Sequence, residues 1–396
     1  MIEATPSLNR LIEQASKLLR ERFDAVPTWV SMAPGRVNLI GEHTDYNRGW
    51  VLPIAVDRYT VLAAAPGRVP DTIRVFSTAV GQQATLSLGD TAPGNKPVGH
   101  PVEWIRYLEG MVAQYRDRNV ICPALDIVAV SSVPLGGGLS SSAALEIAAA
   151  HLIEAAAAQV MTSEIRITAG IGAERDYVGV PCGMMDQTVV ERARAAHALL
   201  LDCADESFTH VPCFGADIAT LVIHSGVSHA LAAGAYAERR AECEMAAATL
   251  GLSSLRQAEL GQLSALEDQP LLMARARHVI TENHRVHGVA KALMSGDAQG
   301  AGVLLSESHQ SLRDDFAVSC EAVDRLVALA QEEEGVLGAR MTGGGFGGCV
   351  IALVRRAAVG AAAQSIGVRY SNYTGRPTHC FTVEAVSGAQ EANVPV

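Results

Sequence analysis

Three features are scarce or missing in this 396-residue sequence, and each absence excludes a class of protein. Its eight cysteines include no Cys-x-x-Cys pair, which argues against a zinc site or a disulfide framework and predicts reduced, mostly buried thiols. Basic residues are in deficit, with 31 Lys and Arg against 42 Asp and Glu, so the net charge is −11. Because a general nucleic-acid binder presents a basic face, we do not expect nucleic acid as a partner.

Long hydrophobic runs are also missing. The longest, residues 143–161, is interrupted by Glu146, His151 and Glu154, which excludes a comfortable membrane span. Residues 1–23 carry charges of both signs in an amphipathic pattern, so they predict a helix and not a signal peptide. We therefore expect a cytoplasmic protein without a membrane partner. The oligomeric state is not determined by the sequence, and a monomer is only slightly favoured.

The length predicts two or three domains, and 49% hydrophobic residues are enough to bury sizeable cores. The pattern changes near residue 200. Before it, strand-like segments, among them residues 28–33, 72–77 and 197–202, are mixed with helical segments such as residues 163–177. After it come a strand-like segment, residues 218–224, and long helical patterns at residues 235–249, 271–294, 298–312 and 319–334. We therefore expect a boundary there, with one domain over residues 1–205 and another over residues 206–396.

The most unusual stretch is residues 131–146, Ser-Ser-Val-Pro-Leu-Gly-Gly-Gly-Leu-Ser-Ser-Ser-Ala-Ala-Leu-Glu. A strand-like run precedes it and an alanine-rich helical run follows it. Backbone N–H groups in a glycine loop before a helix N-terminus bind anions, and the serine hydroxyls add donors, one of which can ligate Mg²⁺. This stretch, the first glycine loop, therefore predicts a cradle for a triphosphate. A serine cap after a glycine turn would explain only two of the six residues.

Two better-known nucleotide motifs are not met in the first glycine loop. The Walker pattern requires a lysine, and the loop contains none. The Gly-x-Gly-x-x-Gly fingerprint fits Gly136 and Gly138 but places Ser141 at its sixth position, and no alternating βαβ series follows. A phosphate site of another family is therefore expected.

A second unusual stretch, residues 33–47, reads Ala-Pro-Gly-Arg-Val-Asn-Leu-Ile-Gly-Glu-His-Thr-Asp-Tyr-Asn. Four charged or titratable residues (Arg36, Glu42, His43 and Asp45) stand beside turn residues, which suggests a functional loop on a strand scaffold. A solvated turn is the alternative. Carboxylates, a histidine and a tyrosine suit a polyhydroxylated ligand, because each fixes a hydroxyl by a directional hydrogen bond. They also suit a metal, but the usual His-x₃-His or Cys spacing is absent.

Two further stretches carry chemical groups in unusual settings. Asp186 stands in an apolar run, residues 178–187, where a carboxylate either caps a helix or takes part in chemistry, and both interpretations stay open. Residues 338–354 predict a strand, a glycine loop and a second strand, with five glycines in the six positions 343–348. This second glycine loop lets backbone approach a partner closely, and we expect the first glycine loop or its phosphates to be that partner. A plain hairpin would need only one or two glycines.

These stretches, in this order, resemble the GHMP kinase superfamily of small-molecule kinases and, within it, the galactokinases. Residues 33–47 match the sugar-binding signature of that family without a gap, residues 134–145 its phosphate loop and residues 341–349 its third motif. Shorter matches at residues 178–187, 277–283 and 307–316 extend the resemblance over most of the chain. The resemblance implies an α+β fold of two domains, with the active site in the cleft between them.

The family reaction moves the γ-phosphoryl group of ATP to the anomeric C1 hydroxyl of α-D-galactose and gives galactose 1-phosphate and ADP, with Mg²⁺ as cofactor. Carried over by position, Asp186 is the base that faces the C1 hydroxyl, Arg36 stabilises the transferring phosphoryl group, and Ser142 and Glu174 ligate Mg²⁺. The residues implied to bind galactose are Glu42, His43, Thr44, Asp45, Gly183, Asp186 and Tyr236. Those implied to bind ATP are Ser77, Trp104, Gly136, Gly137, Gly138, Leu139, Ser140, Ser141 and Ser142.

Some alternatives stay open beside this interpretation. One is a related 1-kinase for N-acetylgalactosamine, arabinose or galacturonate, although Glu42 argues against an acidic sugar, which would need a cation there. The other is a non-catalytic galactose sensor, but such proteins lack two residues of the first glycine loop, and Ser140–Ala144 is complete here. Trp104 lies on a helical stripe whose default place is the core. Whether Asp186 is a true base or only orients the hydroxyl is also open.

Overall fold

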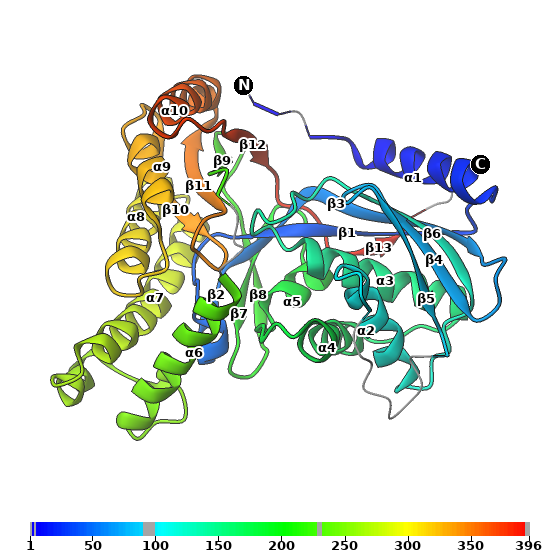
Figure 1. Cartoon of the computed structure of the whole chain (residues 1–396). Coiled ribbons are helices and arrows are strands. Elements are labelled where there is room, and N and C mark those ends of the chain that lie inside the picture. Colours follow the sequence, from blue (N-terminus) through cyan, green and yellow to red (C-terminus); the bar gives the residue numbers. More distant parts are fainter. Residues whose placement is uncertain (1, 4, 90–99, 228–231, 393–396) are drawn as a thin grey trace.

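The computed structural model describes the chain except for residues 1, 4, 90–99, 228–231 and 393–396 (Figure 1). Its first half is built on a six-stranded sheet in the order β13-β1-β3-β6-β4-β5. Neighbouring strands run antiparallel except for β4 and β6, which run parallel. The strands are β1 (Trp29–Asn38), β3 (Pro53–Pro66), β4 (Thr72–Ser77), β5 (Gln82–Ser87), β6 (Leu125–Ser131) and β13 (Gln390–Glu391).

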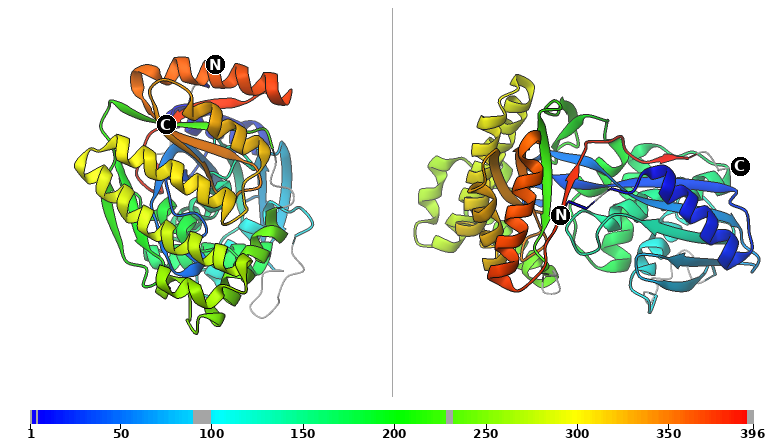
Figure 2. Two further views of the ribbon diagram at one scale, coloured as in Figure 1. Left: turned by 90° about the vertical axis from the view of Figure 1, so that its left-hand side faces the viewer. Right: turned by 90° about the horizontal axis from the view of Figure 1, so that it is seen from above.

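Helices cover both faces of this sheet. Helix α1 (Leu8–Phe23) lies over one face, as the view from above shows (Figure 2). The other face carries α2 (Ile105–Arg116), α3 (Ser141–Ala157), α4 (Ser163–Ala173) and α5 (Met185–Arg192) (Figure 1). Alternation along β3 explains both layers, because Val61 packs toward α1 whereas Leu62 packs toward the opposite core. Both faces of β3 are therefore buried, one under α1 and the other under the helices of the opposite core.

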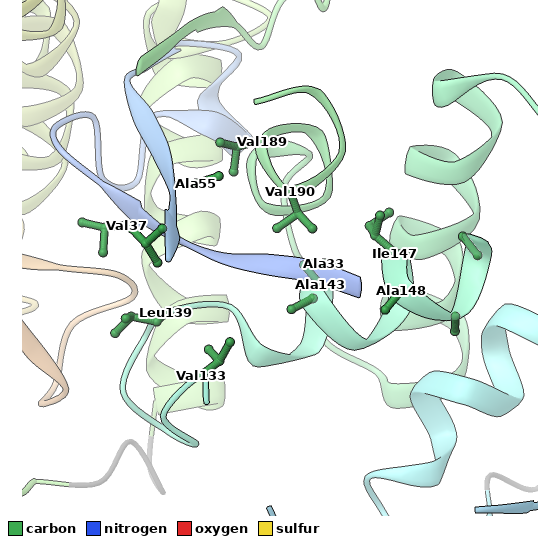
Figure 3. Packing of buried hydrophobic residues seen from close by; sticks show 14 of the residues in the cluster. Ala33, Val37, Ala55, Val133, Leu139, Ala143, Ile147, Ala148, Val189 and Val190 are labelled. Carbon is green, nitrogen blue, oxygen red and sulfur yellow. The ribbon is translucent and has the colours of Figure 1, made fainter. Parts of the chain in front are cut away.

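The first glycine loop rests directly on the core. Val133 and Leu139, on either side of its three glycines, are almost fully buried. Figure 3 shows them near Val37 of β1, with α3 and α5 packed against the same strand. Truncating a buried leucine such as Leu139 to alanine costs roughly 2–5 kcal/mol of stability. The core therefore holds the loop, β1 and α5 in one fixed arrangement.

The second half contains a four-stranded antiparallel sheet, in the order β10-β11-β9-β12. Along β11, Ile351 packs toward the core of the first half, whereas Val350 and Ala352 pack toward a second core with the helices. This sheet is buried on both faces and joins the two halves. Its strands and the helices of this half are β9 (Ile218–His224), β10 (Val336–Thr342), β11 (Cys349–Arg355), β12 (His379–Val383), α6 (Ala232–Thr249), α7 (Pro270–Ser295), α8 (Ala298–Asp314), α9 (Glu321–Gln331) and α10 (Val359–Thr374).

A small sheet of β2 (Trp50–Val51), β7 (His197–Asp202) and β8 (Phe208–Pro212) lies between the halves. Strand β8 pairs with β7, and β13 pairs with β1, so backbone pairing crosses the expected boundary at residues 205/206, which stays a prediction. The short helical turns are η1 (Asp45–Asn47), η2 (Glu174–Val178), η3 (Leu255–Gln257), η4 (Leu260–Leu266) and η5 (Arg356–Ala358).

Two expectations about cysteines and membranes can be compared with the structure. All eight cysteines are free, and five of them are buried, as predicted. None of the helices in the described part of the chain combines the length and apolarity that crossing a bilayer requires.

Candidate active site

Two cavities lie close to each other, because Glu174, which lines one of them, interacts with Ser142, which lines the other. The inner cavity has a volume of about 190 Å³ and is lined by residues of both halves of the chain. Its polar and glycine lining residues are Arg36, Glu42, His43, Asp45, Glu174, Gly183, Asp186, Tyr236, Gly343 and Gly344. The outer cavity has a volume of about 870 Å³, and its lining includes Ser77, Trp104, Gly136, Ser141 and Ser142. Most of the predicted site residues therefore line one of these two adjoining spaces.

Asp186 is held firmly on the wall of the inner cavity. Arg36 binds it at two points, with Nε 2.8 Å from Oδ1 and Nη2 2.7 Å from Oδ2. Ser140 Oγ also donates to Asp186 Oδ2, and Nη1 of Arg36 donates to the Gly138 carbonyl. Two-point arginine–carboxylate pairing fixes orientation as well as charge. Asp186 lies inside the first turn of α5, whose N-cap residue is Met184, so the helix-capping interpretation is wrong and the chemical role of Asp186 stays a prediction.

The start of α3 is built to receive an anion. Its N-cap residue, Ser140, has a left-handed backbone (φ 56°) and uses its hydroxyl for Asp186, so no side chain caps the helix. The first N–H groups of a helix have no intrahelical acceptor and bind anions readily. Among the described residues, Trp104 Nε1 is buried without a hydrogen-bond partner, which leaves a donor for a ligand in the outer cavity. Gly137, Gly138, Leu139 and Ser140 do not line this cavity.

The second glycine loop approaches the first, as predicted. A Cβ atom built on Gly343 would lie 3.3 Å from the Gly138 Cα, and Gly343 has a φ of +86°. A side chain at this position would be strained and crowded. The two glycine loops are therefore in close contact at Gly138 and Gly343.

Glu42 joins the loop after β1 to the second half of the chain. Its Oε1 accepts hydrogen bonds from Thr342 Oγ1 (3.1 Å) and Gly343 N (3.2 Å), and its Oε2 pairs with Arg340. Burial raises the pKa of Glu42, although Arg340 acts in the opposite direction. Glu282 of α7 supports the same loop by accepting from Gly41 N at 3.0 Å. Neither Arg340 nor Glu282 was predicted from the sequence. The signal available for Arg340 was a charge inside an otherwise apolar strand before the second glycine loop.

The remaining residues of the loop after β1 have different surroundings. His43 is buried, its Nδ1 lies 2.9 Å from the Tyr46 hydroxyl, and burial together with His278 lowers its pKa to about 3. The Thr44 hydroxyl donates to the carbonyls of Gly41 and Trp50, both at 2.7 Å, so it supports the loop and does not line the inner cavity. His43 is therefore a neutral imidazole at the cavity wall.

Asp45 lies against Gly183. A Cβ atom on Gly183 would lie only 1.8 Å from Asp45 Oδ2, so only glycine leaves room for this carboxylate. Burial, and with it the charge of Asp186, raises the pKa of Asp45 to about 6. Tyr236 of α6 closes the cavity, with its ring centroid 5.5 Å from that of His43. Sugar-binding roles for these residues stay predictions.

A carboxylate network lies behind the cavity wall. Gln187 Nε2 donates to Glu146 Oε2 (2.9 Å) and to Glu174 Oε2 (2.8 Å). Burial and the charge of Asp186 raise the pKa of Glu174, while hydrogen bonds from Gln187, Cys182 and Ser142 oppose the rise. Glu174 and Ser142, the predicted metal ligands, are therefore neighbours. Within the described residues there is no group of three or more His, Cys, Asp or Glu side chains that could hold a metal ion alone.

Comparisons with known proteins identify the family. Three family models match in succession: the galactokinase galactose-binding signature over residues 17–69, the GHMP kinases N-terminal domain over residues 106–193 and the GHMP kinases C-terminal model over residues 289–371. Human galactokinase is 40% identical over 390 residues, which cover 97% of each chain. Galactokinase of Roseiflexus sp. is 40% identical over 382 residues, covering 93% of this chain and 95% of that protein.

A solved structure gives the same result. The crystal structure of Lactococcus lactis galactokinase complexed with galactose superimposes with a TM-score of 0.89 and 30% sequence identity, covering 95% of this chain and 98% of that chain. The mevalonate kinase of Methanococcus jannaschii shares only the fold, with a TM-score of 0.64 and 17% identity. Because the identity to galactokinases extends over almost the whole length of both chains, this protein belongs to the galactokinase family of the GHMP kinases.

Proposed function

We propose that the chain transfers the γ-phosphoryl group of ATP to the anomeric C1 hydroxyl of α-D-galactose, giving galactose 1-phosphate and ADP. The observation that carries this proposal is the position of Asp186. Arg36 and Ser140 hold its carboxylate at the inner cavity, next to the first glycine loop. A hydroxyl bound in the inner cavity therefore meets a carboxylate on one side and the phosphate-binding loop on the other.

Asp186 and Arg36 divide the chemistry between them. A sugar hydroxyl is a weak nucleophile, and a carboxylate that accepts its proton accelerates such reactions by roughly 10²–10⁴-fold. Phosphoryl transfer depends mostly on positioning and on stabilising charge at the phosphoryl oxygens, and Arg36 supplies a buried positive charge there. Because Ser140 donates to Asp186, the loop that receives the phosphates also orients the base.

Ser142 and Glu174 are proposed to hold Mg²⁺. A hydroxyl and one buried carboxylate fit this ion, because Mg²⁺ prefers oxygen ligands and completes its shell with waters and substrate phosphates. The ion, when bound, neutralises charge on the phosphates. Gln187 holds Glu174 by one hydrogen bond and so orients its carboxylate.

The inner cavity is proposed to select galactose by its hydroxyl groups. Asp45 and Tyr236 are the expected readers of the 3- and 4-hydroxyls, and His43 and Glu42 of the 6-hydroxyl. A site built to bond a hydroxyl leaves its own buried groups unpaired when that hydroxyl is misplaced, so discrimination against the 4-epimer can be large. The fixed contacts of Glu42 and His43 within the protein keep these walls rigid.

The test is ADP release with Mg-ATP across galactose, glucose, N-acetylgalactosamine, galacturonate and arabinose. We expect strong turnover with galactose and little with glucose. Turnover on another sugar of the panel would keep the kinase chemistry and replace the substrate. An absence of turnover on every sugar, with galactose still bound in calorimetry, would favour the sensor.

A further inference from the structure

A third cavity, here called the side cavity, lies beside α1 and outside the active site. It has a volume of about 690 Å³, within the usual range for small-molecule sites. Its walls come from α1, from β3, from β12 and from residues 130–135, which include the start of the first glycine loop. Nothing in the proposed reaction uses this space.

Arg58 of β3 lines the side cavity, and its burial is unusual for an arginine. Its side chain is only 2% exposed, and within the described residues its Nε and Nη2 atoms are buried without any hydrogen-bond acceptor. The guanidinium lies over the Phe381 ring, 4.4 Å from the ring centroid. Burial lowers the pKa of Arg58, with Asp57 and Glu3 acting in the opposite direction. A buried, unpaired guanidinium is costly, and an oxyanion is the partner that its planar fork matches.

The charges around Arg58 also favour an anion. Arg10, His224 and His379 line the same cavity, whereas Glu3 is its one acidic lining residue. The Glu3 carboxylate lies 3.8 Å from His379 Nδ1 and is more than half exposed, so solvent screens its charge. In a chain with a net charge of −11, this concave surface carries two arginines, Arg10 and Arg58, against one carboxylate.

We propose that the side cavity binds a small metabolite through an oxyanion group, a phosphate ester or a carboxylate, which pairs with Arg58. The site is separate from the catalytic centre but adjoins it, because Ala79, Ser131 and Leu135 line both the side cavity and the outer cavity. A phosphate probe would also bind the first glycine loop, so the test needs that loop to be filled.

The experiment is calorimetric titration of inorganic phosphate, and separately of acetate, into the full chain saturated with ADP, Mg²⁺ and galactose. We expect one anion to bind per chain, and Arg58→Gln to weaken binding by about tenfold or more. The matched control is Arg22→Gln, which removes a guanidinium that also lies over a phenylalanine, 3.5 Å from the Phe76 centroid, but outside the side cavity. This control should bind as the wild type does. Tighter binding of phosphate indicates a phosphate ester, and tighter binding of acetate a carboxylate.

No binding to the wild type, or equal binding to wild type and Arg58→Gln, would overturn the proposal. If Arg58→Gln does not fold, as judged by circular dichroism, a second measurement decides. Crystals of the wild-type complex soaked in selenate should show anomalous density within hydrogen-bonding distance of Arg58. Selenate found only elsewhere in the molecule would overturn the proposal equally.

Discussion

The inner and outer cavities are neighbours but are lined by different kinds of residue. Charged and aromatic side chains in fixed pairs line the inner cavity, and the Arg36–Asp186 pair is the clearest of them. The outer cavity is more than four times larger and is lined by serines and Gly136 of the first glycine loop together with Trp104, Tyr107 and several aliphatic side chains. Under the proposed function, the sugar is recognised through paired side chains and the phosphate chain through the first glycine loop.

The largest effect is expected from Asp186→Ala, which removes the carboxylate from the inner cavity. Turnover should fall by roughly 10²–10⁴-fold, because the acceptor of the hydroxyl proton is lost. Galactose should still bind, since the other walls remain. ADP release measures the first effect and calorimetry with galactose the second. Turnover close to that of the wild type would remove Asp186 from both the base role and the orienting role.

Gly183→Ala tests whether the inner cavity depends on exact side-chain positions. The added Cβ would lie 1.8 Å from Asp45 Oδ2, so the Asp45 carboxylate must move. We expect the KM for galactose to rise roughly 10- to 100-fold, as when hydrogen bonds to a charged group are lost, and the KM for ATP to change little. Gly215→Ala is the control, because nothing lies within 4 Å of a Cβ there. Equal effects on both substrates would contradict the separation of the cavities.

Sequence patterns predicted the elements better than the contacts between them. The segments 72–77, 197–202 and 218–224 were predicted as strands with the bounds that the structure has, because each is a short run rich in apolar residues. The helix predicted over residues 163–177 is confirmed, although its last turn, Glu174–Val178, is a π-helix and not an α-helix. The strand expected over residues 28–33 continues to Asn38, into the charged motif.

In the site too, sequence patterns predicted individual residues better than the contacts between them. Residue patterns marked Arg36 and Asp186 as unusual, but only the family resemblance placed these residues, 150 positions apart, side by side. Glu146 was noted merely as an interruption of an apolar run, yet it is fully buried and bound to Gln187. Its partner comes from another helix, and no local periodicity reports such a tertiary pairing.

Substituting Glu146 is expected to have an effect of intermediate size. Burial and the charge of Glu174 raise the pKa of Glu146 well above its usual value, so we expect a neutral acid there. Glu146→Gln keeps the shape and an acceptor for Gln187, whereas Glu146→Leu removes the acceptor. We expect Glu146→Leu to raise the Mg²⁺ concentration needed for half-maximal activity about tenfold, and Glu146→Gln to have much less effect. Identical behaviour of the two variants would exclude this positioning role.

Trp104→Ala tests the outer cavity alone. Losing the indole should raise the KM for ATP about three- to tenfold, since an aromatic contact contributes modestly beside the backbone that holds the phosphates. The KM for galactose should stay unchanged, because Trp104 does not line the inner cavity. Initial rates at varied ATP and at varied galactose give both constants. A larger effect on the KM for galactose than on the KM for ATP would indicate that the two cavities act as one site.

The smallest effect is expected on stability, from the buried Asp45 carboxylate in the wall of the inner cavity. The pKa of Asp45 is about 6 in the folded chain, against an ordinary value of 3.8. Between these values the folded state holds the proton and the unfolded state does not, so stability falls as the pH rises through this window. Asp45→Asn removes the titration and should be more stable than the wild type at pH 8, with the difference shrinking toward pH 4. Urea unfolding at pH 4, 6 and 8 measures it, and a constant difference would show that Asp45 titrates normally.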